Sequence, residues 1–505
     1  MVEAPSASPA RHQSGIRLAA GHGVSAENAH EAPAPAQEEL PQRRHRRSYS
    51  GLHGCRAEVR LPHRVEDLAA TLAEARTQGR RVTLAGAGLS FDAQALGADV
   101  IVSTARLDHI EVDPERAVVR VGPGARWHDI VRATSTRGFL TPVMVSSGDT
   151  TAGGTVGTNG LSRFSPVFGK EGCWVRAVRL LLSDGTEVRA SRDEHPELFF
   201  AAVGGLGLVG VITEVEYELL AVDTPLRVES WVERRPALEG LAEALVFTPE
   251  RDVSAQTAYA VLVADGDALR VLLTRSRYVA GVPLKRMLPH RPDSPMRVPI
   301  ELAIQNLKGA GQRFWRFAYD HYVREDRPYV DDLEGYTFFM DGNVRTRRFA
   351  RRLRLPFRAA QQTFVLPSAG GDEALLPFLR ACHRRVRDSR LSLAMFDVLH
   401  LPEDEPFALS STRGQAGFAV TLTLDGTLRD ADMYRVERLL GGLSALALRL
   451  GGRVHLTKNV FASSDTVAAM YRDGLRELAE LRKRYDPQGV LTSDFARRRL
   501  PSLCR

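Results

Sequence analysis

At 505 residues the chain is long enough to form two or more globular domains. With 44% hydrophobic and 26% charged residues, its composition is that of an ordinary soluble protein. No apolar run reaches the roughly 18 residues that cross a bilayer, so we expect no transmembrane segment. The N-terminus lacks the apolar core of a secretory signal, and we therefore expect a cytoplasmic location.

The four cysteines, Cys55, Cys173, Cys382 and Cys504, form no C-x-x-C pair. Their spacing argues against a disulfide framework and against a zinc site, and it fits a reducing compartment. We expect no bound metal.

A net charge of +7 keeps one alternative open, a basic nucleic-acid-binding protein. Most arginines, however, alternate with acidic residues along expected helix faces, which is typical of a solvated surface. The compact basic cluster at residues 43–47 (R-R-H-R-R) indicates a solvated tail. We expect no nucleic-acid partner.

Along the chain, residues 1–47 are rich in Ala, Pro, Ser, His and Glu without apolar periodicity, which predicts a disordered leader. Residues 48–225 alternate short strands and helices and predict a first domain of α+β class. Its strands are expected at residues 81–84, 118–121, 175–182 and 211–218, and its helices at residues 65–79, 127–136 and 198–202.

Residues 226–450 carry longer polar and aromatic stretches and few tight glycine motifs, and we expect a second α+β domain inserted into the first. Two of its strands are predicted at residues 257–263 and 416–424. Residues 451–505 are expected to return to the first domain. There Val467, Met470, Leu475, Leu478 and Leu481 predict one helix face, with Asp465 as N-cap and the end at Asp486-Pro487.

Two glycine-rich segments predict a phosphate cradle. Residues 85–91 (A-G-A-G-L-S-F) directly follow a predicted strand, and glycines let consecutive N–H groups point at one anion. By itself this segment is equally typical of an ordinary turn. Residues 147–160 interleave five glycines with hydroxyl side chains, which leaves backbone donors unobstructed.

A third segment, residues 203–213, spells G-x-G-x-x-G at Gly205, Gly207 and Gly210. A dinucleotide-binding Rossmann motif needs a strand before it and a helix after it. Here the predicted order is the reverse, so we exclude a Rossmann site. A Walker loop is also excluded, because Phe164 stands at its glycine position and Glu171 follows Lys170.

The three segments, in this order and spacing, resemble the flavin domain of the vanillyl-alcohol oxidase superfamily, with residues 196–213 close to a family signature. The resemblance implies a PCMH-type FAD-binding domain of two α/β subdomains with an inserted substrate (cap) domain. The tail, through residues 451–458, 484–487 and 493–498, is similar to that of decaprenylphosphoryl-ribose oxidases, in which FAD oxidises a hydroxyl of a lipid-phosphate ribose.

Carried onto this sequence, the resemblance implies a set of flavin contacts and an essential lysine at Lys458. The implied flavin contacts are Ala85, Gly86, Ala87, Gly88, Leu89, Ser90, Phe91, Ser146, Thr151, Ala152, Gly153, Gly154, Thr158, Asn159, Gly160, Leu161 and Ile212.

The sequence departs from these relatives at the flavin linkage and on the substrate side. Many relatives link the flavin through a histidine where this chain has Leu89, so we expect noncovalent FAD. Phe91 stands in place of a tyrosine and Leu161 in place of a histidine, with Arg163 as a cation two residues on. His455 replaces another tyrosine.

A cysteine of the relatives aligns with Thr421. The flavin contacts are therefore retained, while the substrate side differs.

We therefore expect an FAD-dependent oxidoreductase that oxidises a CH–OH group of a sugar or polyol derivative, including phospho- or lipid-linked sugars, by hydride transfer to flavin N5. Lys458 is the expected electrostatic stabiliser and a candidate base, Arg163 the anion-binding residue, and His455 a stacking residue or proton acceptor. An aldonolactone or alditol oxidase and a sterol Δ24-reductase-like flavoenzyme are the alternatives. The electron acceptor, a reductase partner and a peripheral membrane contact stay open.

Overall fold

The structure, a computed structural model, describes residues 43–223, 226–248, 255–286, 301–304 and 307–504. Most of the predicted leader, residues 1–42, thus lies outside the described residues. No helix in the described part of the chain is long and apolar enough to cross a membrane.

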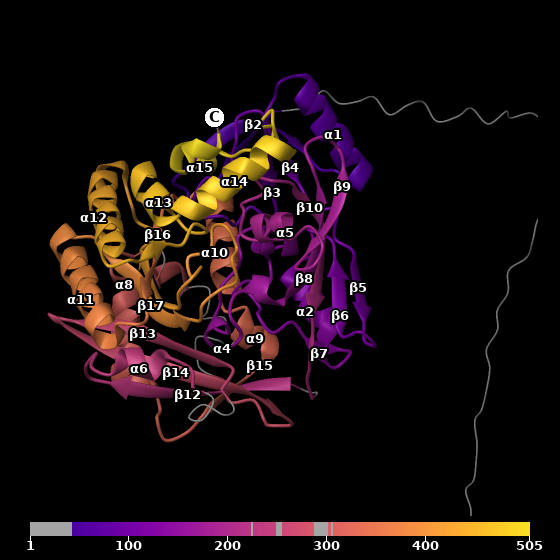
Figure 1. The fold of residues 1–505 in the computed structure, drawn as a ribbon. Coiled ribbons are helices and arrows are strands. Elements are labelled where there is room, and N and C mark those ends of the chain that lie inside the picture. The colour runs from indigo at the N-terminus through magenta and orange to yellow at the C-terminus, as the bar shows by residue number, and fades with distance from the viewer. Residues whose placement is uncertain (1–42, 224–225, 249–254, 287–300, 305–306, 505) are drawn as a thin grey trace, which may run out of the picture. The chain divides into compact units, whose positions relative to one another are not determined.

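The first sheet has four strands in the order β1-β2-β4-β3, and α1 packs beside it (Figure 1). The basic cluster is not part of a disordered tail, because it forms strand β1 and pairs antiparallel with β2. Its side chains are all exposed, so no apolar pattern marked this edge strand in the sequence. The elements are β1 (Arg43–Arg47), β2 (Gly54–Arg60), α1 (Val65–Thr77), β3 (Val82–Ala85) and β4 (Val100–Ser103).

The second sheet has five antiparallel strands in the order β5-β6-β10-β8-β9. Strands β6 and β10 begin and end at the predicted residues, because their alternating or apolar patterns are local signals. The sheet strands are β5 (Ile110–Asp113), β6 (Val118–Val121), β8 (Val175–Leu181), β9 (Glu187–Ser191) and β10 (Val211–Glu218). Around them lie α2 (Trp127–Ser135), β7 (Phe139–Leu140), α3 (Ala152–Val156), α4 (Ser165–Phe168), α5 (Pro196–Ala202) and β11 (Leu220–Ala221).

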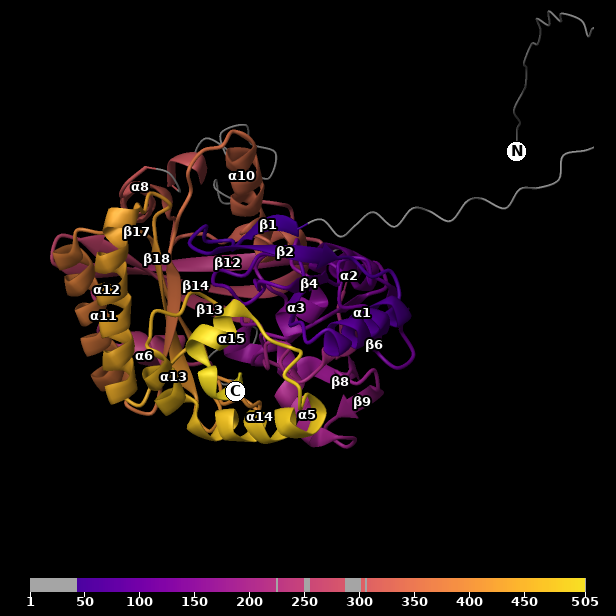
Figure 2. The same ribbon diagram turned by 90° about the horizontal axis from the view of Figure 1, so that it is seen from above.

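The second domain is built on one eight-stranded antiparallel sheet in the order β15-β12-β14-β13-β17-β18-β16-β19. Helices α11 and α12 lie side by side along one face of it (Figure 2). Phe364 of β16 packs against Phe378 of α11 on that face, with ring centroids 5.4 Å apart. The strands are β12 (Leu226–Arg235), β13 (Thr257–Asp265), β14 (Ala268–Ala280), β15 (Tyr329–Asp332), β16 (Gln361–Pro367), β17 (Leu393–Leu401), β18 (Gly417–Leu424) and β19 (Arg453–Val454).

The opposite face of this sheet is turned toward the first domain. Side chains alternate between the two faces of a strand, so Leu399 and Leu401 of β17 point away from Phe396 and Val398. They form a cluster with Leu161 of the second glycine segment. The helices of the domain are α6 (Leu241–Leu245), α8 (Ala310–Phe317), α9 (Leu333–Thr337), α10 (Asp341–Arg352), α11 (Gly371–Ser389) and α12 (Asp430–Arg449).

The C-terminal segment joins both domains. Strand β19 completes the second domain's sheet, so the predicted boundary after residue 450 falls inside that sheet. The chain then returns to the first sheet, where Val82 N donates to Val490 O at 2.8 Å and Thr492 N donates to Val82 O at 3.0 Å. Helix α14 lies beside α5 (Figure 1).

The single helix predicted over the tail is wrong, because the structure has two helices, α13 (Ser464–Met470) and α14 (Arg472–Tyr485), followed by α15 (Asp494–Arg499). Buried Tyr471 interrupts them with non-helical φ −123°, and its hydroxyl donates to Val454 O at 2.6 Å. The N-cap is Ser463 rather than Asp465, and its Oγ accepts from Thr466 N. A tertiary hydrogen bond thus breaks a locally continuous apolar pattern.

Candidate active site

One cavity lies where the three glycine-rich segments and strand β10 meet, although these segments are far apart in the sequence. It contains part of the predicted cofactor set. It also contains four residues of the third segment, of which only Ile212 was an expected flavin contact. The lining residues from these segments are Ala85, Gly86, Ser90, Gly153, Gly154, Gly157, Thr158, Leu206, Gly207, Val211 and Ile212.

The first two segments pack too closely for any side chain at their contact. A methyl group at Gly86 would lie 2.2 Å from Thr151 Oγ1, and one at Gly153 would lie 2.6 Å from Pro123 Cβ. Within the described residues, the buried Thr151 Oγ1 has no hydrogen-bond partner. A buried hydroxyl without a partner is unfavourable, and a phosphate oxygen would satisfy it. The residues present therefore fit the pyrophosphate of a cofactor such as FAD.

The other predicted residues of the first segment lie beside this cavity. Gly88 has φ +70°, a conformation that favours glycine, and Ala87 precedes it in the same turn. Leu89 and Phe91 pack in a small apolar cluster with Tyr49. None of these four lines the cavity itself.

The other predicted residues of the second segment hold the loop in place. Ser146 O accepts from Met340 N, and buried Ala152 N donates to Ala125 O. Asn159 does not offer its side chain to a ligand, because Nδ2 donates to Asp404 Oδ2 at 2.8 Å and Oδ1 accepts from Gly172 N. Gly160 is required beside Glu171, since a methyl there would lie 2.6 Å from Oε2.

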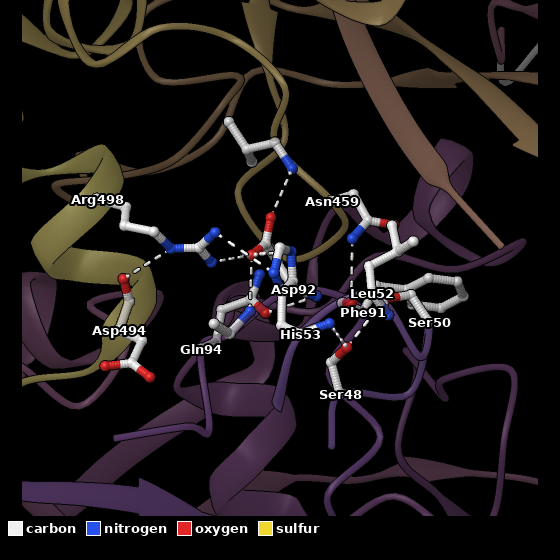
Figure 3. A network of polar contacts seen from close by, with 12 residues as sticks. Ser48, Ser50, Leu52, His53, Phe91, Asp92, Gln94, Asn459, Asp494 and Arg498 are labelled. Carbon is white, nitrogen blue, oxygen red and sulfur yellow. Dashed lines mark hydrogen bonds and ion pairs between the residues drawn. The ribbon is translucent and has the colours of Figure 1, made fainter. Parts of the chain in front are cut away.

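Asp92, directly after the first glycine segment, is the centre of a buried polar network (Figure 3). Its carboxylate accepts from Val460 N at 3.1 Å and from the Arg498 guanidinium at 2.7 Å, and His53 Nε2 lies 3.1 Å away. Burial by itself would raise the pKa of Asp92, but the hydrogen bond and charge of His53 and the charge of Arg498 lower it to about 2. Asp92 therefore joins the first glycine segment to the C-terminal loop.

The same loop carries Lys458, and two amides fix its path. Gln94, which also lines the cavity, donates to Leu456 O at 2.8 Å and to Lys458 O at 3.0 Å. Asn459 Nδ2 donates to Phe91 O at 3.0 Å (Figure 3). The Lys458 ammonium lies 5.0 Å from the centroid of the Phe91 ring, within cation–π range. The expected lysine is thus held next to the first glycine segment.

Lys458 and Arg163 share a carboxylate that the sequence did not single out, that of Asp397 on β17. Burial raises the pKa of Asp397 to about 7, although the charges of Lys458 and Arg163 and a hydrogen bond from Thr421 oppose this rise. Burial likewise lowers the pKa of Lys458, and the charge of Asp397 opposes that change. The three groups form one charged cluster between the two domains.

Arg163 lies among aromatic rings. Its guanidinium carbon is 3.5 Å from the ring centroid of Phe339 and 4.4 Å from that of Tyr259, with Tyr336 at 5.6 Å. Such contacts stabilise a cation that has left bulk water. Arg163, the expected anion-binding residue, therefore interacts with aromatic rings and with the charge of Asp397.

His455 is buried directly after β19, where its backbone N donates to Thr363 O at 2.9 Å. Burial, with the nearby charges of Lys170 and Lys458, holds the pKa of His455 well below its usual range, so its ring is neutral. Lys170 forms a buried ion pair with Asp404, at 2.8 Å from Oδ2. Lys170 thus holds a loop of the second domain in place. This agrees with the exclusion of a Walker loop, in which the lysine would bind a phosphate.

The sequence contained a faint signal for Asp397. The run L-A-M-F-D-V-L-H-L places one carboxylate inside an otherwise apolar strand, where a charged residue requires a partner. No strand was predicted there, and the cations Lys458 and Arg163 come from distant segments. Gln94, Leu206 and Gly207 were also missed as cavity residues.

Comparisons with known proteins agree with this site. Residues 57–191 match the family model described as FAD binding domain, and residues 407–499 match D-arabinono-1,4-lactone oxidase. Decaprenylphosphoryl-beta-D-ribose oxidase of Mycolicibacterium smegmatis is 24% identical over 83% of this chain and 89% of its own length. The chain thus contains a segment that matches an FAD-binding domain, and over most of its length it is similar to an FAD-dependent oxidase.

Other relatives match over about a third of the chain. Cytokinin dehydrogenase 8 of Oryza sativa subsp. indica is 31% identical over 32% of this chain and 31% of its own length. The mitochondrial L-galactono-1,4-lactone dehydrogenase of Brassica oleracea is 32% identical over 33% of this chain and 28% of its own length. The chain thus spans about a third or less of the length of these two relatives.

Replacing Gly86 by Ala should weaken FAD binding by at least about tenfold, because a methyl 2.2 Å from Thr151 Oγ1 pushes the two segments apart. Titration of the apoprotein with FAD, followed by flavin fluorescence, measures this. Gly442→Ala on α12 is the matched control, since its methyl would meet only Arg385 Nη1 at 3.4 Å. Unchanged affinity in Gly86→Ala would contradict the proposed cradle.

Replacing Asp92 by Asn should lower the free energy of unfolding at pH 7 by about 2 kcal/mol, the equivalent of its pKa shift. The folded-state pKa is depressed, so this stabilisation is present above the usual carboxyl range. It is lost as the pH falls from about 4 toward about 2. Urea unfolding at pH 7 and pH 3 measures this. The difference in the free energy of unfolding between wild type and variant should be smaller at pH 3 than at pH 7. Asp388→Asn, on a more exposed carboxylate, should change stability by less than about 0.5 kcal/mol.

Proposed function

We propose that the chain binds FAD noncovalently and oxidises a CH–OH group of a sugar or polyol derivative, a class that includes phospho- and lipid-linked sugars. When bound, FAD supplies chemistry that side chains lack, since it accepts two electrons and a hydrogen from the substrate carbon. The observation that carries the proposal is the position of Lys458. Gln94 and Asn459 hold its loop against the first glycine segment, so a cation lies beside the cofactor cavity.

Each group in this site has a distinct task. The hydroxyl of Thr151 and the glycine backbone of the first two segments would hold the pyrophosphate. Lys458 would stabilise the negative charge that the cofactor gains. Arg163, held by Phe339 and Tyr259, would keep a second positive charge near the substrate.

The noncovalent mode of binding is supported by Leu89. Its hydrocarbon side chain packs against Tyr49 and Phe91 and offers no atom that can bond to a flavin ring. We also place the protein in the cytoplasm, because all four cysteines are free, as a reducing compartment requires.

An aldonolactone oxidase is the second candidate within the same chemistry. The match of residues 407–499 to D-arabinono-1,4-lactone oxidase favours it, and so does the 32% identity to L-galactono-1,4-lactone dehydrogenase over 33% of the chain. The long match to decaprenylphosphoryl-beta-D-ribose oxidase favours a sugar hydroxyl. Anaerobic reduction of the bound flavin by D-sorbitol, D-ribose 5-phosphate or L-galactono-1,4-lactone distinguishes these substrates.

Purified protein should be yellow, and acid precipitation should release the colour into the supernatant, because no covalent bond retains FAD. Absorbance spectra of supernatant and redissolved pellet measure this. Colour that stays with the pellet would overturn the role given to Leu89.

Replacing Lys458 by Ala should slow flavin reduction by at least about a hundredfold, since a preorganised cation is lost where charge develops. FAD should stay bound, because the cavity walls do not change. Anaerobic stopped-flow absorbance gives the rate, and FAD titration gives the affinity. Lys483→Ala, on an exposed lysine of α14, is the control and should behave as wild type. Wild-type reduction rates in Lys458→Ala would refute the assignment.

A further inference from the structure

Strand register places Asp397 at one end of a polar row on the sheet face that is turned toward the flavin domain. Asp397 pairs with Thr421 of β18, which in turn pairs with Thr363 of β16. The Thr363 and Thr421 hydroxyls lie 3.0 Å apart, and Thr421 hydrogen-bonds the Asp397 carboxylate. Leu399, two residues further along β17, contacts Leu161 of the second glycine segment, so Asp397 shares the face that meets the cofactor loops.

The charges around Asp397 come from two segments outside its own sheet, while the neighbouring strands contribute the uncharged Thr421 and Val261. Lys458 approaches from the C-terminal loop and Arg163 from the second glycine segment. Tyr259 of β13 and Tyr336 of α9 lie beyond Arg163, and burial raises the pKa of Tyr336 to about 12, so it remains a neutral phenol. Asp397 is therefore the one anionic group that the structure brings to the two cations in this row of described residues.

An alcohol oxidation needs a group that accepts the hydroxyl proton, and the alternatives in this site are poorer. Burial lowers the pKa of Lys458 and the charge of Asp397 opposes that change, and a neutral Lys458 would no longer compensate the charge of the Asp397 carboxylate. His455 is neutral, but the adjacent charges of Lys170 and Lys458 oppose its taking up a proton. The Asp397 carboxylate is better suited to accept a proton, because its pKa of about 7 is close to neutral pH.

We propose that Asp397 is the catalytic base of this site, a role that rests on the proposed function above. The substrate hydroxyl loses its proton to the Asp397 carboxylate. The carbon loses its hydrogen, with both bonding electrons, to the bound FAD, and a C=O bond forms. Lys458 is then the electrostatic residue rather than the base, and Thr421 positions the carboxylate.

Anaerobic stopped-flow reduction of the holoenzyme by D-sorbitol, D-ribose 5-phosphate and L-galactono-1,4-lactone tests this role across pH 5 to 9. In wild type the rate constant should rise with pH and level off above about 7, because the basic form of Asp397 appears as the pH passes its pKa. Asp397→Asn should reduce the rate constant by about a hundredfold or more and abolish this rise. FAD affinity should be unchanged. Asp388→Asn, on an exposed acid of α11, is the matched control and should keep both rate and profile.

The variant Thr421→Val separates a base role of Asp397 from a structural one, because only a base role makes the pH profile of flavin reduction shift. Loss of its hydrogen bond removes an interaction that lowers the pKa of Asp397, so the midpoint of the pH profile should move upward. Infrared difference spectra of the oxidised holoenzyme should show a protonated carboxyl band that titrates near neutral pH and is absent in Asp397→Asn.

The outcomes separate the base role from the proposed function. If Asp397→Asn is reduced as fast as wild type, or if the infrared band is unchanged in that variant, the base role is wrong and the oxidoreductase function stands. If none of the three probes reduces wild-type holoenzyme, the proposed function is wrong and the base role is lost with it.

Discussion

The structure of the site depends on the buried carboxylate of Asp92. It accepts hydrogen bonds from the C-terminal loop and from Arg498 while its own backbone continues the first glycine segment. A carboxylate with so many partners is favoured in its charged form even when it is buried. Together with Gln94 and Asn459, this group keeps the loop that carries Lys458 against the segment that would hold the cofactor pyrophosphate.

A second constraint is the balance of charge between the domains. Lys458 and Arg163 are both partly removed from water near the same carboxylate, and two like charges there are unfavourable without an opposite charge. Asp397 supplies the opposite charge, and aromatic rings cover Arg163. The cluster exists only where the face of the eight-stranded sheet meets the cofactor loops, so substrate chemistry is confined to that boundary.

Much of the flavin domain could be predicted because its signals are local. The residues of β6 and β10 follow from short apolar or alternating runs, and Gly86 follows from a turn that no larger residue can make against Thr151. The two elements that were predicted wrongly, strand β1 and the tail helix, depend on contacts that are distant in the sequence. Strand β1 has exposed side chains and is held by backbone pairing and by hydrogen bonds of Arg43 to distant carbonyls. The break at Tyr471 is made by a hydrogen bond to Val454, on a distant strand.

By itself, the sequence indicated a phosphate cradle, because the glycine backbone and hydroxyls that phosphate binding needs are contiguous in the chain, and the resemblance to known flavoenzymes made FAD the expected cofactor. Its likeness to known flavoenzymes also indicated Lys458 and the absence of a linking residue at Leu89. Only the tertiary structure decided which groups accompany that lysine. Asp397, Thr421 and Arg163 lie on separate segments, and they come together through strand register and the Asp92 network, which no local pattern encodes.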